Sequence, residues 1–247
     1  YLPGNPVIVP RNMPGGGSRT AVTWLYTAAP RDGSVLATAD QSLAVEQAMG
    51  DKQLKIDTRE LIYIGNPAAD NNTTAILSTS PVKNIEDDIN LAMERGEVAG
   101  RGSNSWGAWK STRPQWVSEG KLTILVQIGL FKAPDLPNVP LLMDLAKNEE
   151  DRAVLKLLSA STTIGRPIFT TPGVPYDRVK LLRSSFDRMM KDAAFLDVAK
   201  KENLDIQPVS GEEMQRIVAD IVATPPKIAA RLQEIIGGIE QNNNTGK

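Results

Sequence analysis

The chain has 247 residues, of which 41% are hydrophobic and 23% are charged, a balance typical of a globular protein with one large or two small domains. Its formal net charge is −1 and its lysines and arginines form no basic run, which argues against nucleic acid or an anionic membrane as a partner. Cysteine and histidine are both absent, which excludes Ser-His-Asp and Cys-His catalysis, imidazole acid–base chemistry, and zinc sites with nitrogen or sulfur ligands.

The chain begins with Tyr1 rather than Met and shows no signal peptide, so we expect it to be part of a longer gene product. No stretch reaches the ~18 consecutive apolar residues of a membrane span. The longest such run, Leu122–Phe131, is interrupted by polar residues and glycine, and it predicts a buried strand.

The most distinctive stretch is a glycine-rich turn, Gly15–Gly17. The β-branched residues of Val7–Val9 predict a strand before it, and the apolar spacing of residues 18–28 predicts a helix after it. Such a turn aims free backbone N–H groups and the positive end of the helix dipole at one concave place. We therefore take Gly15, Gly16, Gly17 and Ser18 as candidate anion-binding residues.

The residues after the turn indicate which anion it would suit. No Gly-Lys-Ser/Thr ending is present, because Arg19 follows Ser18, and Thr20 stands where a dinucleotide-binding turn has its third glycine. Nucleotide phosphate is therefore disfavoured, whereas a carboxylate would suit the N–H groups equally well. A bare strand-to-helix turn with no ligand is the alternative.

Further along, strand-like and helical patterns alternate. Strands are predicted at residues 35–38, 61–65, 74–78, 98–102, 122–131 and 167–170, and helices at residues 41–49, 85–95 and 149–158. This alternation predicts an α/β protein with a mostly parallel sheet.

The last third of the chain is predicted to be helical. A helix with a buried face of Val179, Leu182, Phe186 and Met189 follows Pro175. Ser210 and Glu213 form a capping box for a second helix, Thr224 caps a third, and the polar tail 237–247 is expected to fray. Helices at the end of a chain that starts with strands and helices suggest two lobes between which the chain crosses and returns.

Two further places carry candidate ligand groups. Ser103, Asn104 and Ser105 follow a predicted strand, where open α/β sheets bind ligands, and Trp106 would add an apolar wall. The alternative is an ordinary polar loop whose tryptophans pack in the core. Arg166 precedes another predicted strand and could bind a carboxylate in a bidentate manner; the alternative is an ordinary surface arginine.

Several motifs in combination resemble one known family. They are Gly4-Asn5-Pro6, the run Asn12–Ser18, Ala29-Pro30-Arg31-Asp32-Gly33, Ile64-Gly65-Asn66-Pro67, residues 88–109, residues 134–140 and residues 165–175. Together they resemble the substrate-binding receptors of tripartite tricarboxylate transporters, the TctC or Bug type, over nearly the whole chain.

The resemblance implies an α/β fold with the two-lobed, type II-like architecture of periplasmic binding proteins and a ligand cleft between the lobes. The expected lobes are residues 1–76 with 166–247, and residues 77–165. It further implies a monomeric periplasmic receptor, not an enzyme, that captures a small organic carboxylate, such as a di- or tricarboxylate, for membrane permease subunits. Neither a cofactor nor a metal is implied.

The resemblance also implies a set of binding residues. Family members hold carboxylates through backbone amides, hydroxyls and bridging waters, which agrees with helix-end amides as the source of positive potential. Carried onto this chain, the binding loop is Asn12–Ser18, and Ala39, Asp40 and Ser103–Trp106 line the cleft.

The chain departs from the family pattern in two places. Family members begin with a further strand and helix, and they carry a long segment between Asp87 and Asp88; neither is present in this sequence. We therefore expect either a truncated product or a sequence from which these segments have been left out. Two other functions stay open: carboxylate sensing for a signalling partner, and hydrolysis by a pair of carboxylates, although no Asp or Glu pair marks such a site.

Overall fold

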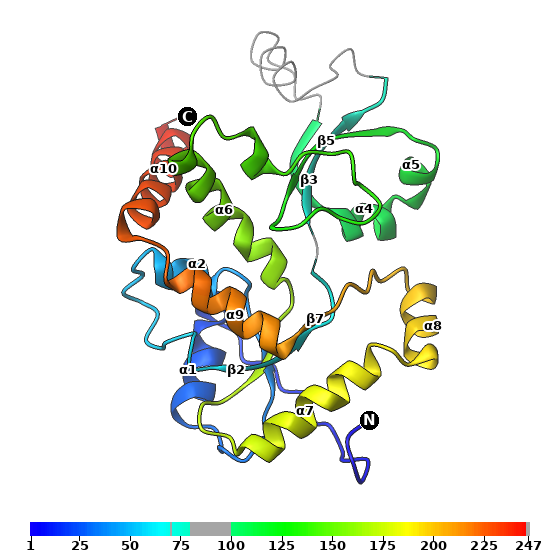
Figure 1. The fold of residues 1–247 in the computed structure, drawn as a ribbon, viewed down its shortest axis with the longest axis vertical. Coiled ribbons are helices and arrows are strands. Elements are labelled where there is room, and N and C mark those ends of the chain that lie inside the picture. Colours follow the sequence, from blue (N-terminus) through cyan, green and yellow to red (C-terminus); the bar gives the residue numbers. More distant parts are fainter. Residues whose placement is uncertain (70, 80–99, 246–247) are drawn as a thin grey trace. The chain divides into compact units, whose positions relative to one another are not determined.

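Figure 1 shows the computed structural model of the chain, which describes residues 1–69, 71–79 and 100–245. Contacts divide the chain into two compact units. The first comprises Tyr1–Ala69, Ile164–Val198 and Ile206–Lys247, and the second comprises Asp70–Thr163 and Ala199–Asp205. The predicted helix at 85–95 and the start of the predicted strand at 98–102 lie outside the described residues.

The sheet of the first unit has four strands in the order β1-β6-β2-β7. These are β1 (Ala37–Thr38), β6 (Ile168–Thr170), β2 (Ile62–Asn66) and β7 (Val209–Ser210). Each neighbouring pair is antiparallel, so the expectation of a mostly parallel sheet is wrong. The reason is that β1 and β2, which run in the same direction, are separated by β6, which inserts between them when the chain returns from the second unit.

Helices of the first unit bury their apolar faces against this sheet. On one side, α7 (Tyr176–Met189) packs on β2 through a cluster of Ile64, Leu182 and Phe186. The approach is so close that a Cβ atom on Gly65 would lie 2.3 Å from the Phe186 ring. The predicted apolar stripe after Pro175 is thereby confirmed as core.

The helix α9 (Gly211–Val222) contacts β2 and also α2 (Leu43–Ala48). Its N-cap is Ser210, whose Oγ accepts a hydrogen bond from the Glu213 amide at 3.2 Å, as the capping box predicts. The helix α10 (Pro226–Thr245) was expected, but it begins after Pro225 rather than directly after the predicted cap Thr224, and it continues through most of the segment that was expected to fray. The helix α8 (Ala193–Lys201) has no counterpart among the three helices predicted in this part of the chain.

The predicted strand Val7–Val9 is absent from the structure. These residues are extended coil, and their exposed fractions are 88% for Val7, 70% for Ile8 and 80% for Val9. A strand needs a neighbour for its N–H and C=O groups, and no described strand pairs with this segment. The β-branched residues favour an extended backbone, but without a neighbouring strand this segment does not form a strand.

The second unit has a three-stranded antiparallel sheet in the order β4-β3-β5. Its strands are β3 (Asn72–Leu77), β4 (Gly100–Ser105) and β5 (Leu122–Ile128), and its helices are α4 (Trp106–Thr112), α5 (Pro114–Ser118) and α6 (Glu149–Ile164). A short 3₁₀ turn, η2 (Leu142–Leu145), precedes α6. The expected lobe boundary after residue 76 falls inside β3, whereas in the structure β3 pairs on both sides with strands of the second unit.

Candidate functional site

The glycine-rich turn is a left-handed corner at the start of a helix. It forms a 3₁₀ turn, η1 (Gly16–Ser18), which runs directly into α1 (Arg19–Thr27). The φ angles are 127° at Gly15, 55° at Gly16, 59° at Gly17 and 70° at Ser18. Glycine adopts such values freely, whereas at Ser18 the left-handed conformation costs about 1 kcal/mol.

The corner is open and its first amides are unused. Gly15, Gly16 and Gly17 are exposed, and Ser18 is half-buried. Among the described residues, the amides of the three glycines donate no hydrogen bond to backbone outside this turn. The positive end of the α1 dipole lies at the same place, so the corner can hold a negatively charged group.

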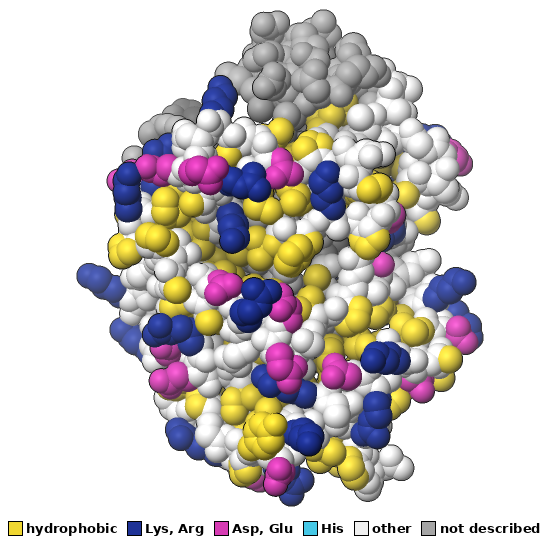
Figure 2. Space-filling view, viewed as in Figure 1, with side chains coloured by type: hydrophobic (Ala, Val, Ile, Leu, Met, Phe, Trp, Pro, Cys, Tyr) yellow, Lys and Arg dark blue, Asp and Glu magenta, His cyan; other side chains and the backbone are white. Residues whose placement is uncertain are grey.

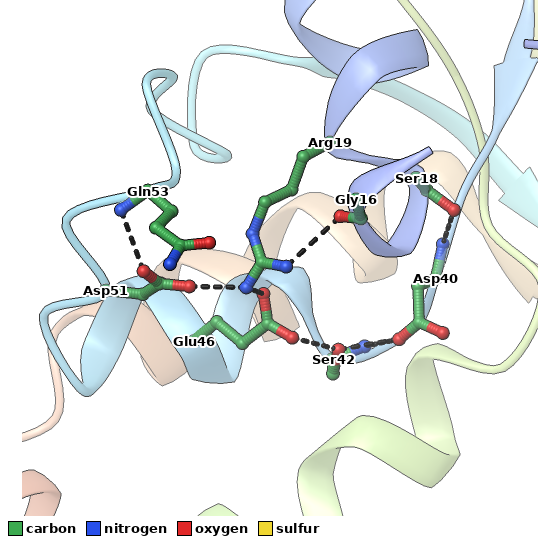
Figure 3. Close-up of polar contacts among 8 residues, drawn as sticks. All are labelled: Gly16, Ser18, Arg19, Asp40, Ser42, Glu46, Asp51 and Gln53. Carbon is green, nitrogen blue, oxygen red and sulfur yellow. Dashed lines mark hydrogen bonds and ion pairs between the residues drawn. The ribbon is translucent and has the colours of Figure 1, made fainter. Parts of the chain in front are cut away.

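Ser18 and Asp40, which are both predicted site residues, are in direct contact. The Asp40 amide donates a hydrogen bond of 3.1 Å to Ser18 Oγ (Figure 3). Because Oγ accepts this bond, its own proton is left for another acceptor, and no such acceptor occurs among the described residues. Ala39 and Asp40 follow β1 directly, as expected, and the short β1 strand thus brings Asp40 to the corner.

The Asp40 carboxylate caps the segment that leads into α2. Asp40 Oδ1 accepts hydrogen bonds from the Ser42 amide at 2.8 Å and from Ser42 Oγ at 2.6 Å. Ser42 Oγ also lies 2.6 Å from Glu46 Oε1. The corner and the first turn of α2 are therefore joined by consecutive hydrogen bonds.

Arg19 is a part of this corner that the sequence reasoning missed. Its Nη1 donates to the Gly16 carbonyl at 3.1 Å, and its Nη2 contacts Glu46 Oε2 at 2.7 Å and also the Asp51 carboxylate (Figure 3). The Gln53 amide and then Arg19 hold the pKa of Asp51 below its usual range, and the bond to Asp51 raises the pKa of Arg19. The available signal was an arginine immediately after the glycine turn, but its acidic partners are distant in sequence.

The predicted residues of the second unit lie where β4 runs into α4. Ser103 is exposed, Asn104 is half-buried, and Ser105 caps α4 by accepting a 3.0 Å hydrogen bond from the Ala108 amide. Trp106 is only 5% exposed and donates its Nε1 proton to Asp135 Oδ2 at 2.8 Å. Its ring packs in the core with Trp109 and Ala75, as the alternative interpretation held, so it offers a ligand almost no surface.

Arg166 and Asn12 are both exposed. The Arg166 amide donates to the Oδ1 atom of the fully buried Asn66 at 3.2 Å, which fixes its backbone beside the end of β2. Its guanidinium makes no hydrogen bond or ion pair with the described residues and is therefore available to an anion. Asn12 lies in the coil before the glycine turn, and no described contact fixes its side chain.

A pocket of about 190 Å³ lies elsewhere, along α7 and the start of α9. Its lining includes Lys180 and Arg183 but also Asp187 and Glu212, so it favours neither sign of charge, and it contains none of the predicted site residues. On the face drawn in Figure 2, Lys and Arg side chains are likewise intermixed with Asp and Glu. We therefore keep the glycine corner as the candidate site.

The described residues contain no group of three or more acidic side chains arranged to hold a metal ion. No helix in the described part of the chain is both long enough and apolar enough to cross a membrane.

Comparisons with known proteins identify the fold. No family model matches the sequence, and no curated protein matches it. Among solved structures, a TctC solute binding protein from Polaromonas, solved without ligand, superposes with a TM-score of 0.61 at 15% sequence identity. The superposition covers 90% of this chain and 86% of that one. The chain has the fold of a TctC-type solute-binding protein.

Other structures with this fold give similar values. MatC from Rhodopseudomonas palustris, solved with bound malate, has a TM-score of 0.52 at 13% identity, with 87% of this chain and 85% of that one covered. A further R. palustris protein, solved with adipate, has a TM-score of 0.54 at 14% identity, with 87% and 83% covered. The solute-binding-protein fold confirms the predicted two-lobed α/β class.

Proposed function

We propose that this chain is a solute-binding protein of the periplasm that captures a small organic carboxylate and hands it to membrane permease subunits. Its fold supports this function, because proteins with the same fold have been solved with malate and with adipate. The observation that carries the proposal is the open corner at Gly15–Ser18, where unused amides and the start of α1 lie together.

The corner supplies three kinds of attraction to one carboxylate group. The amides of Gly15, Gly16 and Gly17 donate hydrogen bonds, and bonds to a charged acceptor are the stronger ones. The Ser18 hydroxyl, oriented by the Asp40 amide, adds a fourth donor. The α1 dipole adds positive potential without a Lys or Arg side chain at the ligand.

Arg166, in the same unit as the corner, and Ser103, Asn104 and Ser105 of the second unit remain the other predicted binding residues. The Arg166 guanidinium can bind a carboxylate group in a bidentate manner, and the hydroxyls and the Asn104 amide can bond polar substituents of an acid. Because backbone amides recognise a carboxylate irrespective of its substituents, these side chains would distinguish one acid from another.

A melting experiment tests the proposal. The chain would be heated with malate, adipate, citrate and other small organic acids, and with the neutral diamide of malic acid as a matched control. An acid present at ~100 times its Kd adds roughly 2.7 kcal/mol to the free energy of unfolding. The midpoint of unfolding then rises by several degrees, at about 2–4 °C per kcal/mol. A panel in which no acid raises the midpoint, or in which the diamide raises it equally, would contradict the proposal.

A further inference from the structure

The left-handed corner needs support from outside itself. The positive φ at Ser18, unlike those at the three glycines, persists only where the surrounding structure over-determines the conformation. Gly15, Gly16 and Gly17 are exposed, so this support has to come from the side facing α2. Arg19 is the residue that makes the connection, since it bonds both to Gly16 and to acidic residues of α2 and the following loop.

We propose that Arg19 is a positioning residue: it holds the glycine corner against α2 so that the amides of Gly15–Gly17 stay aimed at the ligand. The proposal rests on the proposed function. It assigns Arg19 a role opposite to the one its charge suggests, because an arginine beside an anion site would ordinarily be taken for a ligand-binding cation.

The contacts of Arg19 leave little of its guanidinium for a ligand. Nη2 lies between two carboxylates, those of Glu46 and Asp51, and Nη1 is bonded to the Gly16 carbonyl. The third nitrogen, Nε, is buried without a hydrogen-bond partner in the described structure. The side chains of Arg19, Glu46 and Asp51 are only about one-quarter exposed, at 25%, 23% and 23%.

The same contacts close a ring around the corner. From Gly16 the contacts pass to Arg19, to Glu46, to Ser42, to Asp40 and to Ser18; each of these links is a hydrogen bond or an ion pair, with Ser42 using its hydroxyl toward Glu46 and its amide toward Asp40, and the backbone between Gly16 and Ser18 closes the ring (Figure 3). Every member therefore limits the movement of its neighbours. A corner held in its bound shape loses less entropy on binding than a mobile one, so Arg19, Glu46 and Ser42 contribute to affinity without touching the ligand.

Three variants test the proposal, with one matched control. Arg19→Met removes the contacts of the guanidinium with Gly16, Glu46 and Asp51. Glu46→Gln removes one ion pair but keeps an acceptor for Ser42. Arg19→Lys keeps the positive charge but lacks the planar guanidinium group. Arg183→Met is the control, because Arg183 also bonds a backbone carbonyl, that of Tyr63, and pairs with a carboxylate, that of Glu212. Its side chain is 19% exposed, close to the value for Arg19.

Two measurements separate this proposal from the proposed function. The first is the NMR order parameter of the Gly16, Gly17 and Ser18 amides without ligand. We expect it to fall from about 0.85 to below about 0.6 in Arg19→Met, with a smaller fall in Glu46→Gln and no change in Arg183→Met. The second is the Kd for malate and for adipate, which we expect to rise about tenfold in Arg19→Met, to recover in part in Arg19→Lys, and to stay unchanged in Arg183→Met.

The outcomes are distinct. Unchanged order parameters in Arg19→Met overturn the positioning role, as does a Kd that rises equally in Arg183→Met. If the unmodified chain binds no acid, the proposed function fails, and the order parameters alone then decide whether Arg19 holds the corner. If Arg19→Met does not fold, Glu46→Gln provides the same two readouts.

Discussion

The amide of Asp40 donates a hydrogen bond of 3.1 Å to Ser18 Oγ, across 22 residues of sequence. This bond leaves the Ser18 hydroxyl proton free and fixes the direction in which it can be donated. It also connects the second residue after β1 to the only non-glycine member of the left-handed corner. Ser18 therefore serves both the conformation and the chemistry of the candidate site.

Two substitutions of Ser18 separate these roles. We expect Ser18→Ala to destabilise the chain by about 1–2 kcal/mol, because it loses the hydrogen bond and keeps the strain of φ 70°. Ser18→Gly loses the same bond but relieves the strain, so it is expected to be the more stable of the two. Both variants lack the hydroxyl donor and should bind malate more weakly. Thermal unfolding and calorimetric titration check this, and an alanine variant as stable as the glycine variant would contradict the account of the corner.

Gly65 is predicted to tolerate no side chain. A Cβ atom there would lie 2.3 Å from the Phe186 ring, so Gly65→Ala should cost about 2–4 kcal/mol through overpacking between β2 and α7. Gly237, in α10, is the matched control because nothing lies within 4 Å of its Cβ position; Gly237→Ala should be neutral or stabilising by up to about 1 kcal/mol. Denaturant unfolding measures both. Shortening the ring in a Gly65→Ala/Phe186→Leu double variant should recover part of the loss, and an unaltered Gly65→Ala midpoint would refute the packing argument.

Elements whose signals lie within a few residues of one another could be predicted from the sequence, whereas those that depend on contacts between distant residues could not. The helices α7 and α9 were correctly located because their signals are local: an apolar stripe in one, and in the other a cap at Ser210 with Glu213 three residues later. The candidate turn was located for the same reason, since only glycine adopts several left-handed conformations in succession without cost.

The failures came from contacts between distant parts of the chain. Val7–Val9 has the composition of a strand, but a strand also needs a partner, which composition does not reveal. The position of β6 between β1 and β2 depends on where the chain re-enters the first unit. The partners of Arg19 lie 27 and 32 residues away, and no periodicity links an arginine at a helix start to acids on another helix and in the loop after it.

A buried glutamine should be essential to the second unit. Gln127 is fully buried; its Oε1 accepts from Asn71 Nδ2 and the Ala133 amide, and its Nε2 donates to the carbonyls of Leu136 and Val139. We expect Gln127→Leu to destabilise the chain by about 3 kcal/mol or more, because it leaves several buried polar groups unpaired. The exposed Gln115 supplies the control, as Gln115→Leu should stay within about 0.5 kcal/mol of the parent. Equal midpoints of chemical unfolding for the two variants would count against this account.

The loss of folding stability at acidic pH should depend on Asp57. Its carboxylate accepts hydrogen bonds from the Arg59 guanidinium and from Gln47 Nε2, and these partners, Arg59 foremost, hold its pKa well below the usual range. Because the pKa is lower in the folded chain than in the unfolded chain, ionised Asp57 stabilises the fold above the unfolded pKa of about 3.9. That stabilisation is lost as the pH falls below this value.

The corresponding experiment compares unfolding free energies between pH 7 and pH 3. The parent chain should lose stability steeply below about pH 4, and Asp57→Asn should start lower at pH 7 and decline less. Asp197→Asn, at an exposed position, should follow the parent curve. Parallel curves of unfolding free energy against pH for the parent and Asp57→Asn would show that Asp57 does not contribute to the loss of stability at acidic pH.

An NMR titration of the ¹⁵N-labelled chain with malate, repeated with its neutral diamide, tests the central claim most directly, because it observes the amides of Gly15, Gly16 and Gly17 individually. The account predicts saturable shifts of these three amides with malate and none with the diamide. Saturable shifts confined to other parts of the chain, or equal responses to the acid and the diamide, would contradict it.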